Sequence, residues 1–296
     1  MADISGDQIR KFFQSLIPMR FRTGIPVVPV VRLTGVIGFS TPLRPGITLS
    51  GVSRVLDRAF AVKKAKAVAI VINSPDGSPV QSHLVFRRIR QLSDEKKIPV
   101  IVFIEDVGAS GGYMIACAGD EIVCDNSSVI GSIGVVGATF GLVKAIEKLG
   151  IERRIYTAGD RKVMLDPFLP EDPEDVQRLK AIQKEIHESF IALVKSRRGT
   201  KLNGPESALF SGEYWAGEQA LRFGLVDRLG ELRTLLRERF GETVMTPLIA
   251  ERGWFSRRFG VGSHVFAGES LLGGGSLAEQ FVSAAEARAI WARYGL

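Results

Sequence analysis

The sequence predicts an α/β protein with a mostly parallel sheet that helices cover on both faces. Short, continuous apolar runs alternate with longer stretches whose apolar residues recur at helical spacing. Strands that alternate with helices are joined by crossovers and pair in parallel, and a strand that is apolar throughout is buried on both faces. The chain has 296 residues, 45% of them apolar and 24% charged, which suits one or two soluble globular domains.

The predicted elements follow one another in a regular order. Strand-like runs cover residues 27–37, 67–73, 100–105, 121–124 and 153–156. Helical patterns cover residues 53–66, 80–92, 113–118 and 142–149. A long helix follows, with Asp172 as its N-cap, Pro173 in its first turn and apolar residues three or four positions apart from Val176 to Leu193.

Two segments flank this alternating core and divide the chain into residues 1–24, 25–245 and 246–296. The first segment predicts a basic amphipathic helix with Ile9, Phe13 and Leu16 on its apolar face. Such a helix can lie on an anionic membrane surface. Its apolar stripe can equally pack on the body of the protein or on a second subunit, which is the commoner role of such helices.

The last segment departs from the strand and helix pattern. Six glycines fall irregularly between residues 260 and 275 and predict a flexible tether. Ser276 and Glu279 then form a capping box for a short helix that runs to Arg293. That helix can dock on the body, bridge two subunits or contact a membrane, and the sequence does not choose among these.

Composition excludes several classes of protein. No apolar run reaches the ~18–20 residues of a membrane span and no secretory signal is apparent, so we expect a cytoplasmic protein, with any membrane contact peripheral and on the inner face. Cys117 and Cys124 are too few for a disulfide framework and lack zinc-site spacing, so we expect buried thiols, no metal and no cofactor. The net charge of +7 is spread along the chain and predicts no specific nucleic-acid partner.

Three loops are candidates for a functional site. Residues 73–78 and 108–112 each follow a predicted strand, and residues 129–137 form an apolar segment rich in glycine. Loops at the carboxyl ends of parallel strands share one crevice, which is where ligands bind in such folds. Ser110 lies in the second loop between glycines, where its hydroxyl can act as a nucleophile beside the N–H of Gly111.

A serine nucleophile needs a base, and the residues leave two kinds open. The G-x-S-x-G spacing around Ser110 matches the nucleophile elbow of α/β-hydrolases, which would make the protein an esterase with a later histidine, His187 or His264. We expect His187 on a helix surface and His264 beyond the alternating core. The other kind of base is a neutral lysine, and Lys162 precedes the apolar residues 163–165.

Several ordered motifs together resemble one family, the protease IV or signal peptide peptidase A type of serine peptidase. The motifs are INSPDG at 72–77, GASGGYMIA at 108–116, VIGSIGVVG at 129–137, AGDRKVMLDPF at 158–168 and WAGEQALRFGLVDRLG at 215–230. The resemblance covers roughly residues 27–239. It implies a caseinolytic protease or crotonase-like fold of repeated β-β-α units that assembles into a ring-like or dome-like homo-oligomer.

The resemblance also implies roles for individual residues. Ser110 would be the nucleophile and Lys162 the general base, with the Ser132 hydroxyl helping to hold the lysine. Gly77 and Gly111 would donate backbone N–H groups to the oxyanion. The substrates implied are short, apolar or unfolded peptides, such as signal peptide remnants.

Two features bear on whether such a site would work. A lysine with a pKa near 10.4 is neutral in only about one molecule in a thousand at pH ~7.5, so Lys162 must be desolvated to act as a base. Asp76 stands where the resembled family has a glycine, next to Gly77. Because aspartate is common in turns, we expect its side chain to face solvent. An inward carboxylate would oppose the oxyanion and favour a non-catalytic, membrane-associated scaffold of the same fold.

Overall fold

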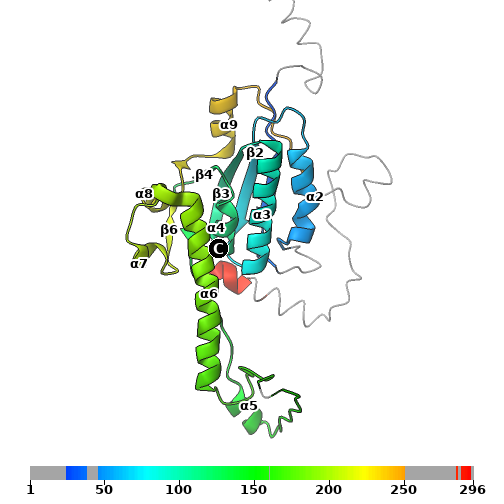
Figure 1. The fold of residues 1–296 in the computed structure, drawn as a ribbon, viewed down its shortest axis with the longest axis vertical. Helices are drawn as coiled ribbons and strands as arrows, with labels where there is room; N and C mark the ends of the chain where they lie inside the picture. Colours follow the sequence, from blue (N-terminus) through cyan, green and yellow to red (C-terminus); the bar gives the residue numbers. More distant parts are fainter. Residues whose placement is uncertain (1–24, 39–45, 160, 251–284, 286–287, 295–296) are drawn as a thin grey trace, which may run out of the picture.

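A seven-stranded sheet forms the centre of the molecule in the computed structural model, which describes residues 25–38, 46–159, 161–250, 285 and 288–294 (Figure 1). Five strands follow the order β1-β2-β3-β4-β7, while β5 pairs with β3 and β6. Every pairing is parallel except that of β5 with β6. The strands are β1 (Val30–Thr34), β2 (Val68–Ser74), β3 (Val100–Ala109), β4 (Glu121–Cys124), β5 (Val129–Gly131), β6 (Tyr214–Ala216) and β7 (Arg228–Leu229). The predicted mostly parallel α/β sheet is thereby confirmed.

Helices cover both faces of the sheet, and successive strand residues face two separate cores. Val31 and Ile70 pack in the first core, with α2, α3, α4, α6 and α8. Val30 and Val71 pack in the second core, against Leu235 of α9. The helices are α2 (Leu49–Phe60), α3 (Pro79–Lys96), α4 (Gly111–Ala116), α5 (Val143–Lys148), α6 (Pro173–Arg198), α7 (Glu206–Leu209), α8 (Gly217–Arg222) and α9 (Leu232–Phe240). The central strands have nearly continuous apolar sequences because they are buried on both faces.

Strand β3 divides between two neighbours, and this division builds the site. Its first half pairs with β4, from Ile101 to Ile104. Its second half pairs with β5, from Val107 to Ala109. The register between β2 and β3 shifts after Ile72, so that Ser74 pairs with Gly108. The irregularity redirects the end of β3, which is a usual consequence of a bulge beside a functional site.

The amino-terminal part of α6 projects away from the sheet, together with α5 and its flanking coil (Figure 1). Buried residues of α6 lie near its carboxyl end, at Phe190, Val194 and Arg198. We call residues 135–185 the arm. Large apolar side chains are exposed along it, including Val136, Phe140, Leu149, Ile151 and Tyr156.

The structure confirms most of the predicted elements and contradicts one. Asp172 caps α6 by accepting a hydrogen bond from the N–H of Glu174, with Pro173 in the first turn as predicted. Residues 153–156 form no strand, because they lie on the arm, away from the edges of the described sheet. The predicted amphipathic helix of residues 1–24 and the glycine tether lie outside the described residues. Among the described residues, no helix is both long and apolar enough to cross a bilayer.

Candidate active site

Ser110 lies at the junction where β3 ends and α4 begins. Its backbone has φ 50° and ψ −118°, a conformation that is costly for a residue with a side chain. Its N–H donates to the carbonyl of Gly131 at 2.8 Å, which extends the β3–β5 pairing by one residue. This sharp strand-to-helix turn leaves the Ser110 side chain half-buried at the carboxyl edge of the parallel strands.

The glycines after Ser110 are required by packing. A Cβ on Gly111 would come within 2.4 Å of the Ser82 Oγ on α3. A Cβ on Gly112 would come within 2.5 Å of the Ser74 carbonyl oxygen at the end of β2. Real Cβ atoms do not approach so closely, so α4 can begin directly against β2 and α3 because both residues lack side chains.

The loop of residues 73–78 is fixed against the segment that follows β1. Ile37 donates its N–H to the Asp76 carbonyl at 3.0 Å, and its own carbonyl accepts from the Ser78 N–H at 2.8 Å. Gly77 has φ +151°, and a Cβ there would lie 2.1 Å from the Ile37 carbonyl oxygen. The backbone of Gly77 is therefore held rigidly, as an N–H donor in a preorganised site must be.

The side chain of Asp76 points into the site, so the expectation that it faces solvent is wrong. Its Oδ1 accepts a hydrogen bond from the Ser110 hydroxyl at 2.6 Å and another from the Gly77 N–H at 2.7 Å. The physical reason is local. The fixed turn aims the Gly77 N–H and the Ser110 hydroxyl at the same place, and a carboxylate oxygen satisfies both donors.

Ser132 lies one residue beyond β5, beside Ser110. Like Ser110 it has a positive φ, 53°, and its N–H donates to the Glu213 carbonyl at 2.6 Å. The next residue, Ile133, accepts a hydrogen bond from the His187 Nε2 at 3.0 Å. The third predicted loop thus begins at the site and then runs out along α6. His187, expected on the helix surface, is half-buried against this loop.

Lys162 lies on the arm, and the structure does not bring it to Ser110. Its neighbour Arg161 forms an ion pair with Glu174, in the first turn of α6, at 3.7 Å. The stretch of α6 from Glu174 to His187 is about 20 Å long at ~1.5 Å per residue, so Lys162 is on the order of 20 Å from the serines. Lys162 is exposed and lines an open hollow with Ala158 and Gly159.

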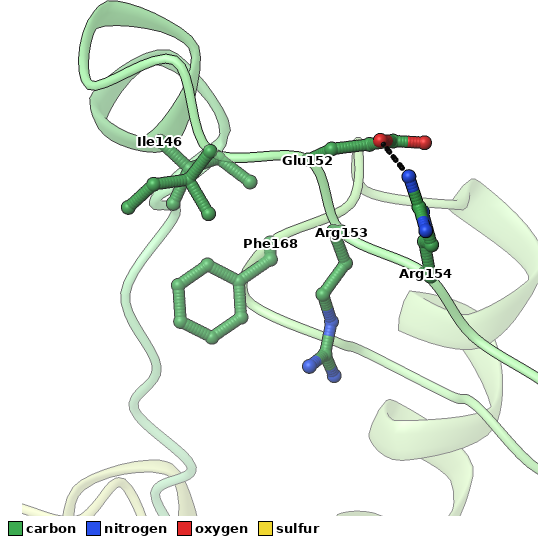
Figure 2. Close-up of a pocket in the computed structure, with 6 residues that line it drawn as sticks. Ile146, Glu152, Arg153, Arg154 and Phe168 are labelled. Carbon is green, nitrogen blue, oxygen red and sulfur yellow. Dashed lines mark hydrogen bonds and ion pairs between the residues drawn. The ribbon is translucent and has the colours of Figure 1, made fainter.

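A second hollow of about 680 Å³ lies at the far end of the arm (Figure 2). Ile146 and Phe168 line its apolar side, and the Arg153 guanidinium lies 5.2 Å from the Phe168 ring centre. Glu152 and Arg154 form an ion pair at its rim, which Figure 2 marks with a dashed line. The far end of the arm therefore has apolar side chains next to charged ones.

Three residues that the sequence motifs do not single out reach the site from elsewhere. The Tyr294 hydroxyl donates to the Ser132 Oγ at 3.4 Å, and its ring meets that of Tyr214 edge-on with 5.0 Å between centres. The Arg293 guanidinium lies 3.9 Å from the Asp76 carboxylate. Figure 1 shows this carboxy-terminal segment beside α6, near α4. The capping box predicts a helix here, but no signal in the sequence indicates where it docks.

The histidines have other partners in this arrangement. His187 is bonded to a backbone carbonyl, and His83 is exposed on α3 with its ring stacked near Phe86. His264 lies outside the described residues. The hydrogen-bond partner of the Ser110 hydroxyl is a carboxylate, Asp76, and not an imidazole. An α/β-hydrolase triad is therefore not assembled among the described residues.

Comparison with known families decides which class of protein this is. The model described as Peptidase family S49 matches residues 93–240, which is half of the chain. The chain belongs to peptidase family S49. The matched residues include Ser110, Ser132 and Lys162.

Two relatives show how far the similarity extends. The protein named "Na(+)/H(+) antiporter NhaA" of Brucella abortus (strain 2308) is 52% identical over 284 residues, which is 95% of this chain and 38% of that protein. "Serine protease SPPA, chloroplastic" of Arabidopsis thaliana is 36% identical over 174 residues, which is 57% of this chain and 25% of that protein. The chain thus matches well under two thirds of either relative. Most of the Brucella protein lies outside the aligned segment, so its antiporter name is not carried over.

Among solved structures, a mutant of the 1510-N membrane-bound stomatin-specific protease is similar in outline. It has 19% sequence identity and a TM-score of 0.43, over 73% of this chain and 85% of that one.

Proposed function

We propose that the chain is a serine endopeptidase with a Ser/Lys dyad, in which Ser110 is the nucleophile and Lys162 the general base. The observation that carries this proposal is the strained turn at Ser110, next to the rigid N–H of Gly77 and to Ser132, in a chain of family S49. Strain of this kind persists where the surrounding structure enforces it, and it is concentrated at functional sites.

The proposed reaction uses these groups in two steps. The Ser110 Oγ attacks the carbonyl carbon of the scissile bond while the neutral Lys162 amine accepts its proton. The N–H groups of Gly77 and Gly111 stabilise the oxyanion, and the protonated amine then gives the proton to the leaving amine. Water, activated in the same way, hydrolyses the acyl-enzyme. The substrates proposed are short, apolar or unfolded peptides, including signal peptide remnants.

Lys162 must reach a serine for this reaction, and we propose that a second copy of the chain makes the meeting possible. The arm exposes Phe140 by 82% and Tyr156 by 90%. Monomeric proteins rarely leave a run of large apolar side chains exposed. A homo-oligomer that buries this surface would bring the arm of one copy to the serine edge of another. Burial there would also supply the desolvation that a lysine base needs.

Hydrolysis of apolar peptides tests the dyad. Ser110→Ala and Lys162→Ala should each lower kcat/KM by about a thousandfold or more, because the nucleophile or its base is lost. Lys184→Ala removes another exposed lysine, on α6, and His187→Gln removes the esterase candidate. Both should keep wild-type activity. Full activity in Lys162→Ala would overturn the dyad, and loss in His187→Gln would favour the esterase.

One observation favours a second function, a non-catalytic scaffold of the same fold. The Asp76 carboxylate already accepts from the Gly77 N–H, one of the two proposed oxyanion donors, and from the hydroxyl of the proposed nucleophile Ser110. If the protein is a scaffold, the wild type should cleave no apolar peptide and Ser110 should resist a fluorophosphonate. Measurable labelling of Ser110 would exclude that function.

A further inference from the structure

The contacts of Asp76 are incompatible with catalysis as they stand. A single carboxylate oxygen accepts both the Ser110 hydroxyl and the Gly77 N–H. A substrate oxyanion would carry negative charge to the same N–H, and two negative oxygens cannot share it. The Ser110 proton is also directed to the carboxylate instead of to a lysine. Asp76 must therefore move before a peptide can react.

The carboxy-terminal segment contacts Asp76 in this inward position. The Arg293 guanidinium approaches the other carboxylate oxygen, Oδ2, to 3.9 Å. The carbonyl of Arg293 accepts from the Tyr214 hydroxyl at 3.3 Å, which fixes the segment to β6. Tyr294 adds its edge-on contact with Tyr214 and its hydroxyl contact with Ser132. Segments some 80 to 220 residues apart in sequence thus meet at one point beside Ser110.

We propose that Asp76 is a latch on Ser110, kept closed by Arg293 and Tyr294 of the carboxy-terminal segment. Asp76 is a positioning residue in this role, because it acts by occupying the hydroxyl and the N–H that the reaction uses. The site opens when the carboxy-terminal segment leaves and the carboxylate swings outward. This inference rests on the proposed function, since it takes Ser110 as the nucleophile.

The strength of the contacts fits a latch that can open. The Arg293 and Asp76 side chains are 49% and 19% exposed, and an ion pair at 3.9 Å in contact with water is weak. The Tyr294 hydroxyl contact is long at 3.4 Å. Burial raises the pKa of Tyr294, and the charge of Asp76 raises it further, so the phenol stays neutral in its docked position. Several weak contacts give a closed state that an incoming peptide can displace.

The rate at which a fluorophosphonate labels Ser110 in the full-length protein tests the latch. Asp76→Gly should raise this rate about tenfold or more, because it frees the Gly77 N–H and removes the opposing charge. Arg293→Gln should raise it about threefold, the scale of a weak exposed ion pair. Arg293→Lys keeps the charge and should remain close to wild type. Arg288→Gln removes a charge from an exposed position of the same segment and is the matched control, expected to leave the rate unchanged.

The labelling rates of these variants distinguish failure of the latch from failure of the proposed function. A general loss of structure lowers reactivity, so a rate increase with an unchanged melting temperature supports the latch. If Ser110 is labelled in the wild type and Asp76→Gly and Arg293→Gln are no faster, the latch is wrong while the nucleophile stands. If Ser110 is labelled in no variant, including Asp76→Gly, the proposed function fails and the latch fails with it.

Discussion

Packing alone is enough to require the glycines that follow Ser110, although the same motif is typical of a catalytic serine. Gly111 and Gly112 are bounded by Ser82 and by the Ser74 carbonyl, at distances that exclude any side chain. Glycines let the backbone approach a neighbouring group closely, and here the neighbouring groups belong to the protein itself. The same crowding forces the turn that presents the serine, so structure and chemistry depend on the same glycines.

Gly112→Ala should destabilise the protein by about 1–3 kcal/mol, because its Cβ would lie 2.5 Å from a backbone oxygen that cannot rotate away. Gly141→Ala is the matched control, since a Cβ there would meet nothing within 4 Å. That change should alter the free energy of unfolding by less than about 0.5 kcal/mol. Denaturant unfolding of both variants makes the comparison. Equal losses at the two positions would contradict the packing explanation.

The two cysteines should be inert in the native protein. Cys117 and Cys124 are free and buried, as the sequence predicts, and burial raises the pKa of each thiol to about 12. At pH 8 only about one molecule in ten thousand would then carry a given thiolate. Mass spectrometry after iodoacetamide treatment should find both unmodified in native protein and both alkylated in denaturant. Rapid native alkylation would show that their surroundings open readily.

The direction in which a side chain points is the feature of this site that the sequence does not predict. The sequence motifs place Ser110, Gly77 and Ser132 at or just beyond the ends of predicted strands, and the structure brings these three residues together. The direction of Asp76 does not follow, because it depends on where a fixed turn aims two donors. Composition favours solvent for an aspartate in a turn, and a pair of unsatisfied donors outweighs that tendency.

At the scale of the elements, α6 is anchored by one buried ion pair near its carboxyl end. The Arg198 guanidinium is 3% exposed and donates to both Asp227 oxygens, at 2.8 and 3.0 Å. Lys201 and the Ile122 N–H also donate to Asp227. Burial alone would raise the pKa of Asp227, but Arg198 and Lys201 hold it below its usual value. The pair fixes the base of the helix from which the arm projects.

Asp227→Ala should cost about 3–5 kcal/mol, because it leaves the Arg198 charge buried without a partner. Glu188→Ala, which breaks an exposed pair with Lys184 on the same helix, should cost less than about 0.5 kcal/mol. A carboxylate with a lowered pKa stabilises the fold above its ordinary pKa and loses that contribution as the pH falls. The difference between wild type and Asp227→Ala should therefore narrow below about pH 4. A constant difference down to pH 2 would contradict this assignment.

The elements were predictable wherever burial set the pattern. The runs that became β2, β4 and the first half of β3 are almost wholly buried, so their sequences are nearly continuously apolar. Residues 153–156, with the sequence RRIY, are predicted to form a strand but have no partner strand in the described part of the chain, and pairing is a tertiary property. Strands β6 and β7 are two or three residues long, too short for periodicity to reveal.

At the scale of the whole molecule, the distance between Lys162 and Ser110 is the main gap between sequence and structure. The motifs imply a dyad, and the single chain separates its members by the length of the arm. A sequence does not indicate whether the residues of a site come from one copy of the chain or from two. The exposed apolar side chains of the arm are the observation on which we base the proposal that the arm packs against another copy of the chain.

Co-expression of two inactive variants tests whether copies share a site. Ser110→Ala and Lys162→Ala chains, each with a different tag and purified through both tags, should recover about half of wild-type activity if the oligomer is a dimer and about a quarter if it is a ring of many copies. These fractions follow from random pairing of one intact serine with one intact lysine across an interface, after oligomers of a single variant have been removed. Each variant alone should stay inactive. A doubly tagged oligomer that forms but remains inactive would show that Ser110 and Lys162 must come from the same copy.

The identity of the nucleophile is tested most directly by mapping a fluorophosphonate adduct after exhaustive labelling of the full-length protein. We predict a single adduct, on the peptide that contains Ser110, in both the wild type and Asp76→Gly, and none in Ser110→Ala. An adduct on another serine that persists in Ser110→Ala, or no adduct in a folded Asp76→Gly protein, would contradict the account.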